Sequence, residues 1–209
     1  MKKNITKEDV EFYDLNGYII FNINDDALID KVNNDVNNYI KEGDFKTNSK
    51  MYSYNDSPRI VESWKVLDSC KRLSLSPIVI SWLEVLSASS PKAFSTINFL
   101  HSTQQPLHSD YVHFGTLPEG KLAGSWIALE DIDPLSGPLQ VVPGSHKLDY
   151  FNYEMVSDSP PKKLDEIKRN YELYEKWVLA LLEKRRGDII YYFMFYIILW
   201  LPKKNHERK

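Results

Sequence analysis

The sequence predicts an α+β fold in which helices come first and strands follow. Apolar residues recur at helical spacing through most of the first 88 residues. From residue 94 onwards, short alternating segments lie between Gly and Pro turns, which is typical of a β-barrel or sandwich. With 209 residues, 43% of them hydrophobic and 26% charged, the chain is most simply one domain, residues 1–209, with a substantial core.

The first two helices are predicted from their ends. Thr6 and Asp9 form a loose capping-box pattern that opens a short helix, and Asn16-Gly17 ends it. Residues 18–21 then predict a short buried strand. A second helix begins at Asp25 or Asp26, keeps apolar residues at helical spacing, and closes at Gly43.

The middle of the chain predicts a loop and two further helices. Residues 44–57 are polar and rich in turn residues, so we expect a surface loop. Residues 59–70 have helical spacing, and Ser76-Pro77 is a typical helix start for residues 78–86. We expect Trp82 to lie in the core.

The second half of the chain predicts strands, one more helix and an apolar end. Strands are expected at residues 94–100, 122–130 and 139–142, and residues 162–186 return to helical spacing. That helix is better explained by packing on the sheet than by binding a partner. Residues 189–201 form an apolar run of thirteen, shorter than the roughly 20 residues of a membrane helix. A buried strand or misfolded sequence is therefore favoured over a tail anchor.

Composition indicates which partners and which cellular compartment to expect. A net charge of -3 and no basic face give no reason to propose a nucleic-acid partner. A single cysteine, Cys70, excludes an intrachain disulfide and fits a reducing compartment. The first residues contain no apolar stretch typical of a secretory signal. We therefore expect a cytoplasmic protein with no membrane partner.

One pair of residues points to metal chemistry. His108 and Asp110 are two positions apart, and on a strand such residues face the same side. An imidazole and a carboxylate would then project side by side, like two corners of the 2-His-1-carboxylate site of non-haem Fe(II) oxygenases. Alone, this pattern is weak, because chance produces it easily.

Four sequence blocks around this pair resemble the phytanoyl-CoA dioxygenase family of Fe(II)/2-oxoglutarate oxygenases. They are QQPLHSD (104–110), SWIALEDI (125–132), GPL (137–139) and VPGSHK (142–147), in the order and spacing typical of the family. The resemblance extends over residues 6–188, and residues 189–209 form a divergent tail.

The resemblance implies both a fold and a reaction. The expected fold is a double-stranded β-helix, a cupin-like jelly roll, with N-terminal helices, one inserted helix and its last barrel strands missing. The expected reaction is hydroxylation of a small organic substrate with Fe(II), O2 and 2-oxoglutarate, releasing succinate and CO2. His108 and Asp110 would be metal ligands, and Trp126 would shape the cosubstrate pocket.

Other candidates for the pocket have ordinary explanations as well. Trp126 could equally be core packing. Gln104 and Gln105 could donate to a carboxylate or be exposed loop amides. Asn98 could line a polar pocket wall from its strand.

The remaining histidines and acidic residues are weaker candidates. His146 lies in a Pro-Gly turn that supplies no ligand in the family. His113 is at an odd spacing from Asp110, so on a strand it would face away, and it would line the substrate mouth or bond locally. His101 has no evident partner. Three acidic residues are expected to form a solvated turn: Glu130, Asp131 and Asp133.

Half of the family's site has no match in this sequence. In the family, a Gly-Asp pair opens a strand that carries the second histidine ligand, and an arginine for 2-oxoglutarate follows. Gly187-Asp188 is present here, but apolar residues follow it, and the next histidine is His206 in a charged tail. A truncated or frame-shifted product is favoured over a natural non-catalytic binding module. Either explanation predicts very slow turnover or none.

The same observation predicts poor behaviour in solution. A barrel without its last strands would leave an open sheet edge beside an apolar run, which is an aggregation hazard. We therefore expect deletion of the residues after Asp188 to improve solubility.

Overall fold

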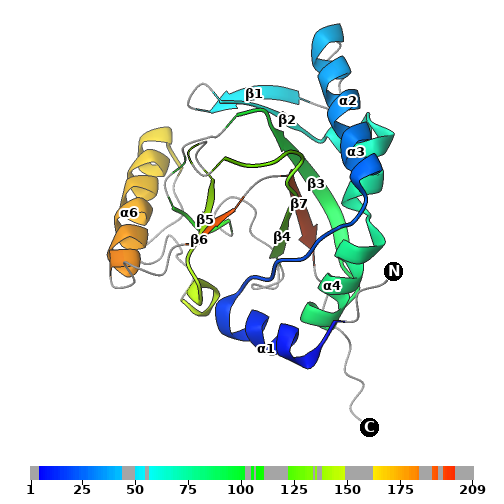
Figure 1. Cartoon of the computed structure of the whole chain (residues 1–209). Coiled ribbons are helices and arrows are strands. Elements are labelled where there is room, and N and C mark those ends of the chain that lie inside the picture. Colours follow the sequence, from blue (N-terminus) through cyan, green and yellow to red (C-terminus); the bar gives the residue numbers. More distant parts are fainter. Residues whose placement is uncertain are drawn as a thin grey trace.

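Two antiparallel sheets form the centre of the protein (Figure 1). The computed structural model describes residues 5–43, 50–54, 57–101, 105, 107–110, 122–133, 135, 138–148, 162–183, 190–192 and 195–200. The larger sheet has the order β1-β2-β3-β7-β4, from strands Lys50–Tyr54, Ser57–Val61, Lys92–Phe99, Phe195–Trp200 and Leu122–Trp126. The smaller sheet pairs β5 (Leu139–Val141) with β6 (Ile190–Tyr192).

Helices lie on both outer sides of the two sheets (Figure 1). One face of the larger sheet is covered by α2 (Asp26–Glu42), α3 (Asp68–Ser74) and α4 (Pro77–Ser87). On the other side of the molecule, α6 (Leu164–Glu183) lies beyond β5 and β6. The remaining described α-helix, α1 (Lys7–Asn16), lies at one end of the molecule.

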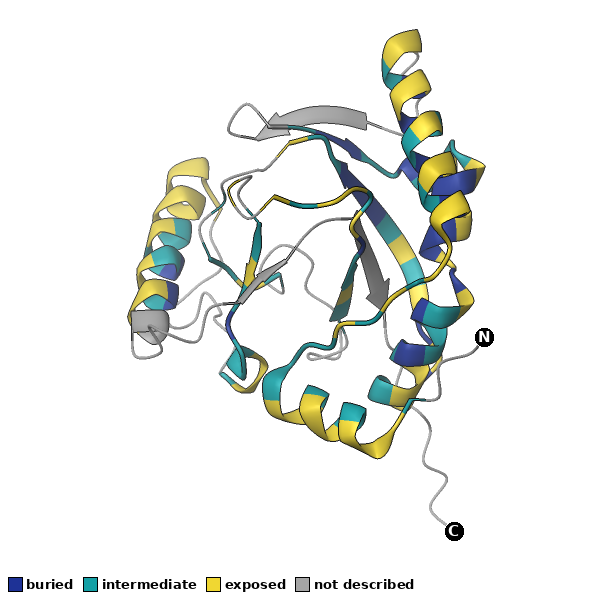
Figure 2. Cartoon of the chain, viewed as in Figure 1, coloured by how far each residue is buried: buried dark blue, intermediate teal, exposed yellow. Residues whose placement is uncertain are grey.

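The main core lies between the larger sheet and its helices. Buried residues of α2, α3 and α4 lie on the sides of these helices that face the larger sheet (Figure 2). They form one cluster with Ile60 of β2. Each such side chain stabilises the fold by about 1.5–3 kcal/mol relative to exposure. Trp82 is buried, as predicted, and its ring stacks on Phe21 at 5.1 Å between centroids. The core members on the helices are Leu28, Val32, Val36, Tyr39, Cys70, Leu73 and Val79.

The helix ends agree closely with the sequence prediction. Thr6 and Asp9 form the full capping box of α1, and Gly17 ends the helix with φ 80°, a left-handed conformation that glycine adopts without strain. Asp25, rather than Asp26, caps α2 and accepts from the backbone N–H of Leu28. α4 begins at Pro77, also as predicted.

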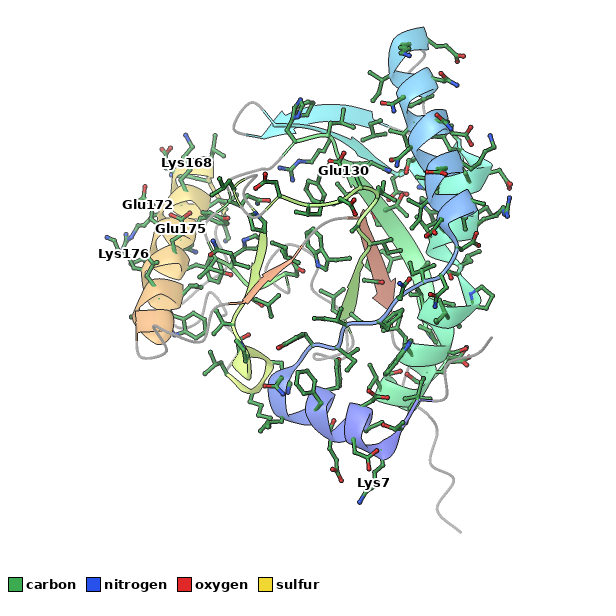
Figure 3. All side chains as sticks on the ribbon, in the orientation of Figure 1. Lys7, Glu130, Lys168, Glu172, Glu175 and Lys176 are labelled. Carbon is green, nitrogen blue, oxygen red and sulfur yellow. The ribbon has the colours of Figure 1, made fainter. Side chains whose placement is uncertain are left out.

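α6 confirms the prediction of a surface helix. Its exposed side carries Lys168, Glu172 and Lys176, which project away from the rest of the protein (Figure 3). Its opposite side carries the buried residues Tyr174 and Val178. Among the described residues, no helix is long and apolar enough to cross a bilayer.

Three predictions for the first half of the chain are wrong. Residues 18–21 have no strand structure, and part of the expected 44–57 loop forms β1. The expected helix over residues 59–70 is instead the end of β2, a short 3-10 turn η1 (Ser63–Lys65) and the start of α3. The register pairs Arg59 with Phe99 and Val61 with Ile97, so pairing with a distant strand overrides the local helical spacing.

The apolar run of residues 189–201 contributes strands to both sheets, which agrees with the strand explanation of this run. β6 and β7 occupy most of the apolar run, and β7 pairs with β3 on one side and β4 on the other. A continuous apolar run suits a strand with neighbours on both sides. The α+β class is therefore confirmed, but the described strands form two separate sheets and no closed barrel.

Candidate metal centre

His108 and Asp110 converge, as the sequence predicts, but they do not lie on a strand. Residues 107–110 have no regular strand or helix structure. The His108 Nε2 atom lies 3.5 Å from the Asp110 Oδ1 atom, and the side chains are 22% and 34% exposed. The pair is thus partly shielded from water but reachable from outside the core.

The donor set fits part of an iron site. Two ligand bonds of about 2.1 Å at a right angle place their donor atoms about 3 Å apart. The observed 3.5 Å is close to that separation, and one nitrogen with a carboxylate suits iron. Within the described part of the chain, no group of three or more His, Cys, Asp or Glu residues could hold a metal ion. Two other candidates, His113 and His206, lie outside the described residues.

Tyr174 of α6 holds the residue between the two candidate ligands. The Tyr174 hydroxyl accepts a hydrogen bond from the Ser109 N–H and donates one to the Ser109 carbonyl at 3.4 Å. Burial raises the pKa of Tyr174 to about 12; the hydrogen bond from Ser109 opposes the increase, and neighbouring groups that include Asp110 add to it. The hydroxyl therefore stays protonated near neutral pH and can keep both bonds.

Trp126 lies on the sheet face turned away from α2, α3 and α4. We call this the inner face, defined by the cluster of Val61, Ile97, Phe99, Leu122 and Trp126. The rings of Phe99 and Trp126 are stacked with centroids 5.5 Å apart. The indole is half-buried, so it can both pack against Phe99 and present a surface to a ligand.

Asn98 lies on the opposite face of the sheet. The register pairs Asn98 with Ile60, which packs against the helices, and paired residues share a face. The buried Asn98 accepts a hydrogen bond from Ser63, while its Nδ2 atom has no hydrogen-bond partner in the described part of the chain. The structure therefore does not bring Asn98 to Trp126.

Arg59 is a residue that the sequence reasoning missed. It is only 5% exposed and lies on β2 opposite Phe99, hence on the inner face. Its guanidinium carbon is 5.1 Å from the centroid of the Phe99 ring, a cation–π distance. An arginine inside an otherwise apolar strand was the available signal, but the sequence pattern placed it on a helix.

The other predicted positions differ in their exposure to solvent. Gln105 is half-buried next to the metal pair in sequence, whereas Gln104 lies outside the described residues. His101 is exposed. His146 is exposed too, and its Nε2 atom lies 3.2 Å from the Asp14 carbonyl oxygen at the end of α1. The acidic cluster is exposed, as expected: Glu130, Asp131 and Asp133.

Comparison with protein families identifies one match. The model of the phytanoyl-CoA dioxygenase (PhyH) family matches residues 64–192, which include His108, Asp110 and Trp126. A comparison with curated proteins found no match.

Comparison with solved structures finds non-haem enzymes of the same fold. The epimerase SnoN in complex with Fe3+, alpha ketoglutarate and nogalamycin RO is 15% identical, with a TM-score of 0.59, over 95% of this chain and 78% of that one. The alpha ketoglutarate dependent carbocyclase SnoK is 16% identical, with a TM-score of 0.57, over 97% and 80%. A second SnoN structure is 17% identical, with a TM-score of 0.54. The match covers 68% of this chain and 62% of the SnoN chain.

Proposed function

Because the chain belongs to the phytanoyl-CoA dioxygenase family, we propose that it is an Fe(II)/2-oxoglutarate-dependent dioxygenase that hydroxylates a small organic substrate, with turnover impaired by the lack of an assigned second histidine ligand. The observation that carries the proposal is the convergence of His108 and Asp110 at 3.5 Å within the family match. The proposed enzyme is one cytoplasmic domain over residues 1–209, built as a double-stranded β-helix. The likeness in fold to the SnoN complex with Fe3+ and alpha ketoglutarate supports the choice of cofactors.

His108 and Asp110 would hold the metal. When bound, Fe(II) would supply oxidation by O2, with one oxygen atom entering the substrate and the other entering succinate as 2-oxoglutarate loses CO2. The protein's own contribution is to hold an imidazole nitrogen and a carboxylate oxygen close together in a partly shielded position.

The inner face would receive 2-oxoglutarate. We place the cosubstrate beside Trp126 and Gln105, with Arg59 as the cation for its distal carboxylate. Arg59 suits this role because a buried planar guanidinium can bind a carboxylate with two parallel hydrogen bonds. The apolar rings of Phe99 and Trp126 would keep water from that ion pair.

The test is succinate release in the presence of Fe(II), ascorbate and 2-oxoglutarate. We expect release to be very slow, to depend on Fe(II), and to be lost in His108→Ala and in Asp110→Ala. Adding His206→Ala shows whether the tail histidine supplies a third ligand. Succinate release that survives in His108→Ala would overturn the proposal. Binding of 2-oxoglutarate without succinate would instead identify a non-catalytic binding module.

The product identifies the type of oxidation. The related folds are named as an epimerase and a carbocyclase, so one fold serves different outcomes. Mass spectrometry of candidate substrates after turnover would show a gain of one oxygen atom if the reaction is hydroxylation. Loss of two hydrogens, or an unchanged mass with inverted configuration, would exclude hydroxylation.

A further inference from the structure

The convergence of the two candidate ligands is not explained by strand geometry. On a strand, the pleat itself would orient residues 108 and 110 to the same side. Residues 107–110 have no such structure here, so another part of the molecule must fix the backbone between the two side chains. Tyr174 contacts this backbone through hydrogen bonds with Ser109.

Tyr174 forms hydrogen bonds with both backbone polar groups of Ser109. Its hydroxyl accepts from the Ser109 N–H and donates to the Ser109 carbonyl. These two groups flank the Cα of Ser109, so fixing them restrains the backbone dihedrals between His108 and Asp110. The direction of both ligand side chains depends on those dihedrals.

The tyrosine is held firmly in its own helix. It is 1% exposed, and its ring packs near Tyr171 at 5.8 Å and Trp177 at 6.5 Å between centroids. A tyrosine side chain has two rotatable angles before the ring, so burial of the ring leaves the hydroxyl little freedom. The buried neighbour Val178, one turn further along α6, secures the same side of the helix.

We propose that Tyr174 is a positioning residue of the metal centre, through which α6 sets the geometry of His108 and Asp110. This inference rests on the proposed function, because it requires that the pair binds a metal. It gives the inserted helix a role beyond packing on the sheet. Groups that orient metal ligands without touching the metal change affinity by about 10–100-fold when they are mutated.

The test compares two tyrosines of one helix in the full-length protein. Tyr174→Phe removes the hydroxyl that holds Ser109, and Tyr171→Phe removes a hydroxyl from the neighbouring ring. Affinity for Co(II), a coloured substitute for Fe(II), is measured by absorption titration well below the melting temperature. We expect Tyr174→Phe to weaken Co(II) binding by about 10–100-fold and Tyr171→Phe to change it less than threefold. Hydrogen exchange should show faster exchange at Ser109 only in Tyr174→Phe.

Each outcome bears on one of the two proposals. If the wild type binds Co(II) through His108 and Asp110 and Tyr174→Phe binds it equally well, the positioning role is wrong. Faster exchange at Ser109 with unchanged Co(II) affinity would also overturn it, because the tyrosine would then stabilise only the loop. If His108→Ala and Asp110→Ala bind Co(II) as the wild type does, the proposed metal centre itself fails.

Discussion

Cys70 is buried in the core between α3 and the larger sheet. Burial raises the pKa of its thiol from 9.0 to about 11, although the nearby polar side chains of Ser63 and Asn98 oppose the increase. The thiolate is the reactive form of cysteine, and it is scarce here at neutral pH. Cys70 therefore behaves as a small apolar residue of the core.

This shift in pKa predicts how stability depends on pH. The unfolded chain releases the thiol proton near pH 9 and the folded protein near pH 11, so the unfolded state binds fewer protons in between. We expect the free energy of unfolding to fall by about 1–3 kcal/mol as the pH rises through this window. Urea denaturation at pH 8, 9.5 and 11 measures the change. In Cys70→Ala the free energy of unfolding should fall less between pH 8 and pH 11 than in the wild type. The same dependence on pH in both proteins would contradict the prediction.

Arg59 provides a second prediction for a single residue. If its guanidinium binds 2-oxoglutarate, Arg59→Gln should weaken 2-oxoglutarate affinity by about 30–150-fold, since a charge-assisted bidentate pair is worth about 2–3 kcal/mol. Arg59→Lys should recover only part of the loss, because lysine keeps the charge without the planar fork. Calorimetric titration of the Co(II)-loaded protein measures this.

A loss of affinity in the Arg59 variants must be separated from the loss of the contact between Arg59 and Phe99. Both variants alter this packing, so melting temperatures are recorded beside the affinities. Equal affinity in wild type and Arg59→Gln would remove Arg59 from the site.

Among the elements, η1 and β3 are joined by a small polar cluster inside the protein. Ser63 of η1 donates a hydrogen bond to Asn98, and its hydroxyl also lies 3.2 Å from the Thr96 hydroxyl. All three residues are buried. This cluster faces the helices, which explains why Asn98 does not reach the inner face.

Removing the centre of this cluster should destabilise the fold. Ser63→Ala leaves Asn98 and Thr96 without this buried partner, which typically costs about 1–3 kcal/mol. Ser81→Ala is the matched control, because the Ser81 hydroxyl bonds within α4 at an exposed position, and such changes stay within about 0.5 kcal/mol. Chemical denaturation compares the two variants. Equal stabilities would show that the cluster contributes nothing.

At the scale of the whole molecule, β7 joins the two halves of the larger sheet. Its residues pair with β3 along one edge and with β4 along the other. Without β7, both strands would have an unpaired edge, and unpaired edges promote aggregation. The expectation that deleting the residues after Asp188 improves solubility is therefore replaced by its opposite.

Two shortened chains test this role of β7. Ending the chain after Asp188 removes β6 and β7, whereas ending it after residue 201 keeps both. We expect the shorter chain to lose its cooperative melting transition, because a domain has a stability of only about 5–15 kcal/mol. The longer one should melt within a few degrees of the full chain. Circular dichroism melting compares them, and equal transitions in both would show that β7 is dispensable.

The sequence alone determined the features that depend on neighbours along the chain. The caps of α1 and α2, the start of α4 and the apolar stripe of α2 follow from local hydrogen bonds and helical spacing, so they were predictable. The placement of His108 and Asp110 side by side was also predicted, although from the geometry of a strand that the structure does not contain.

Only the tertiary structure decided which distant segments meet. Strand pairing turned residues 57–61 into β2, placed Arg59 beside Phe99, and put Asn98 on the helix face. It also inserted β7 between β3 and β4, and it brought Tyr174 of α6 to Ser109. The spacing of residues along a chain carries no information about a partner 40 or more positions away, because that choice depends on the total burial and hydrogen bonding of the folded molecule.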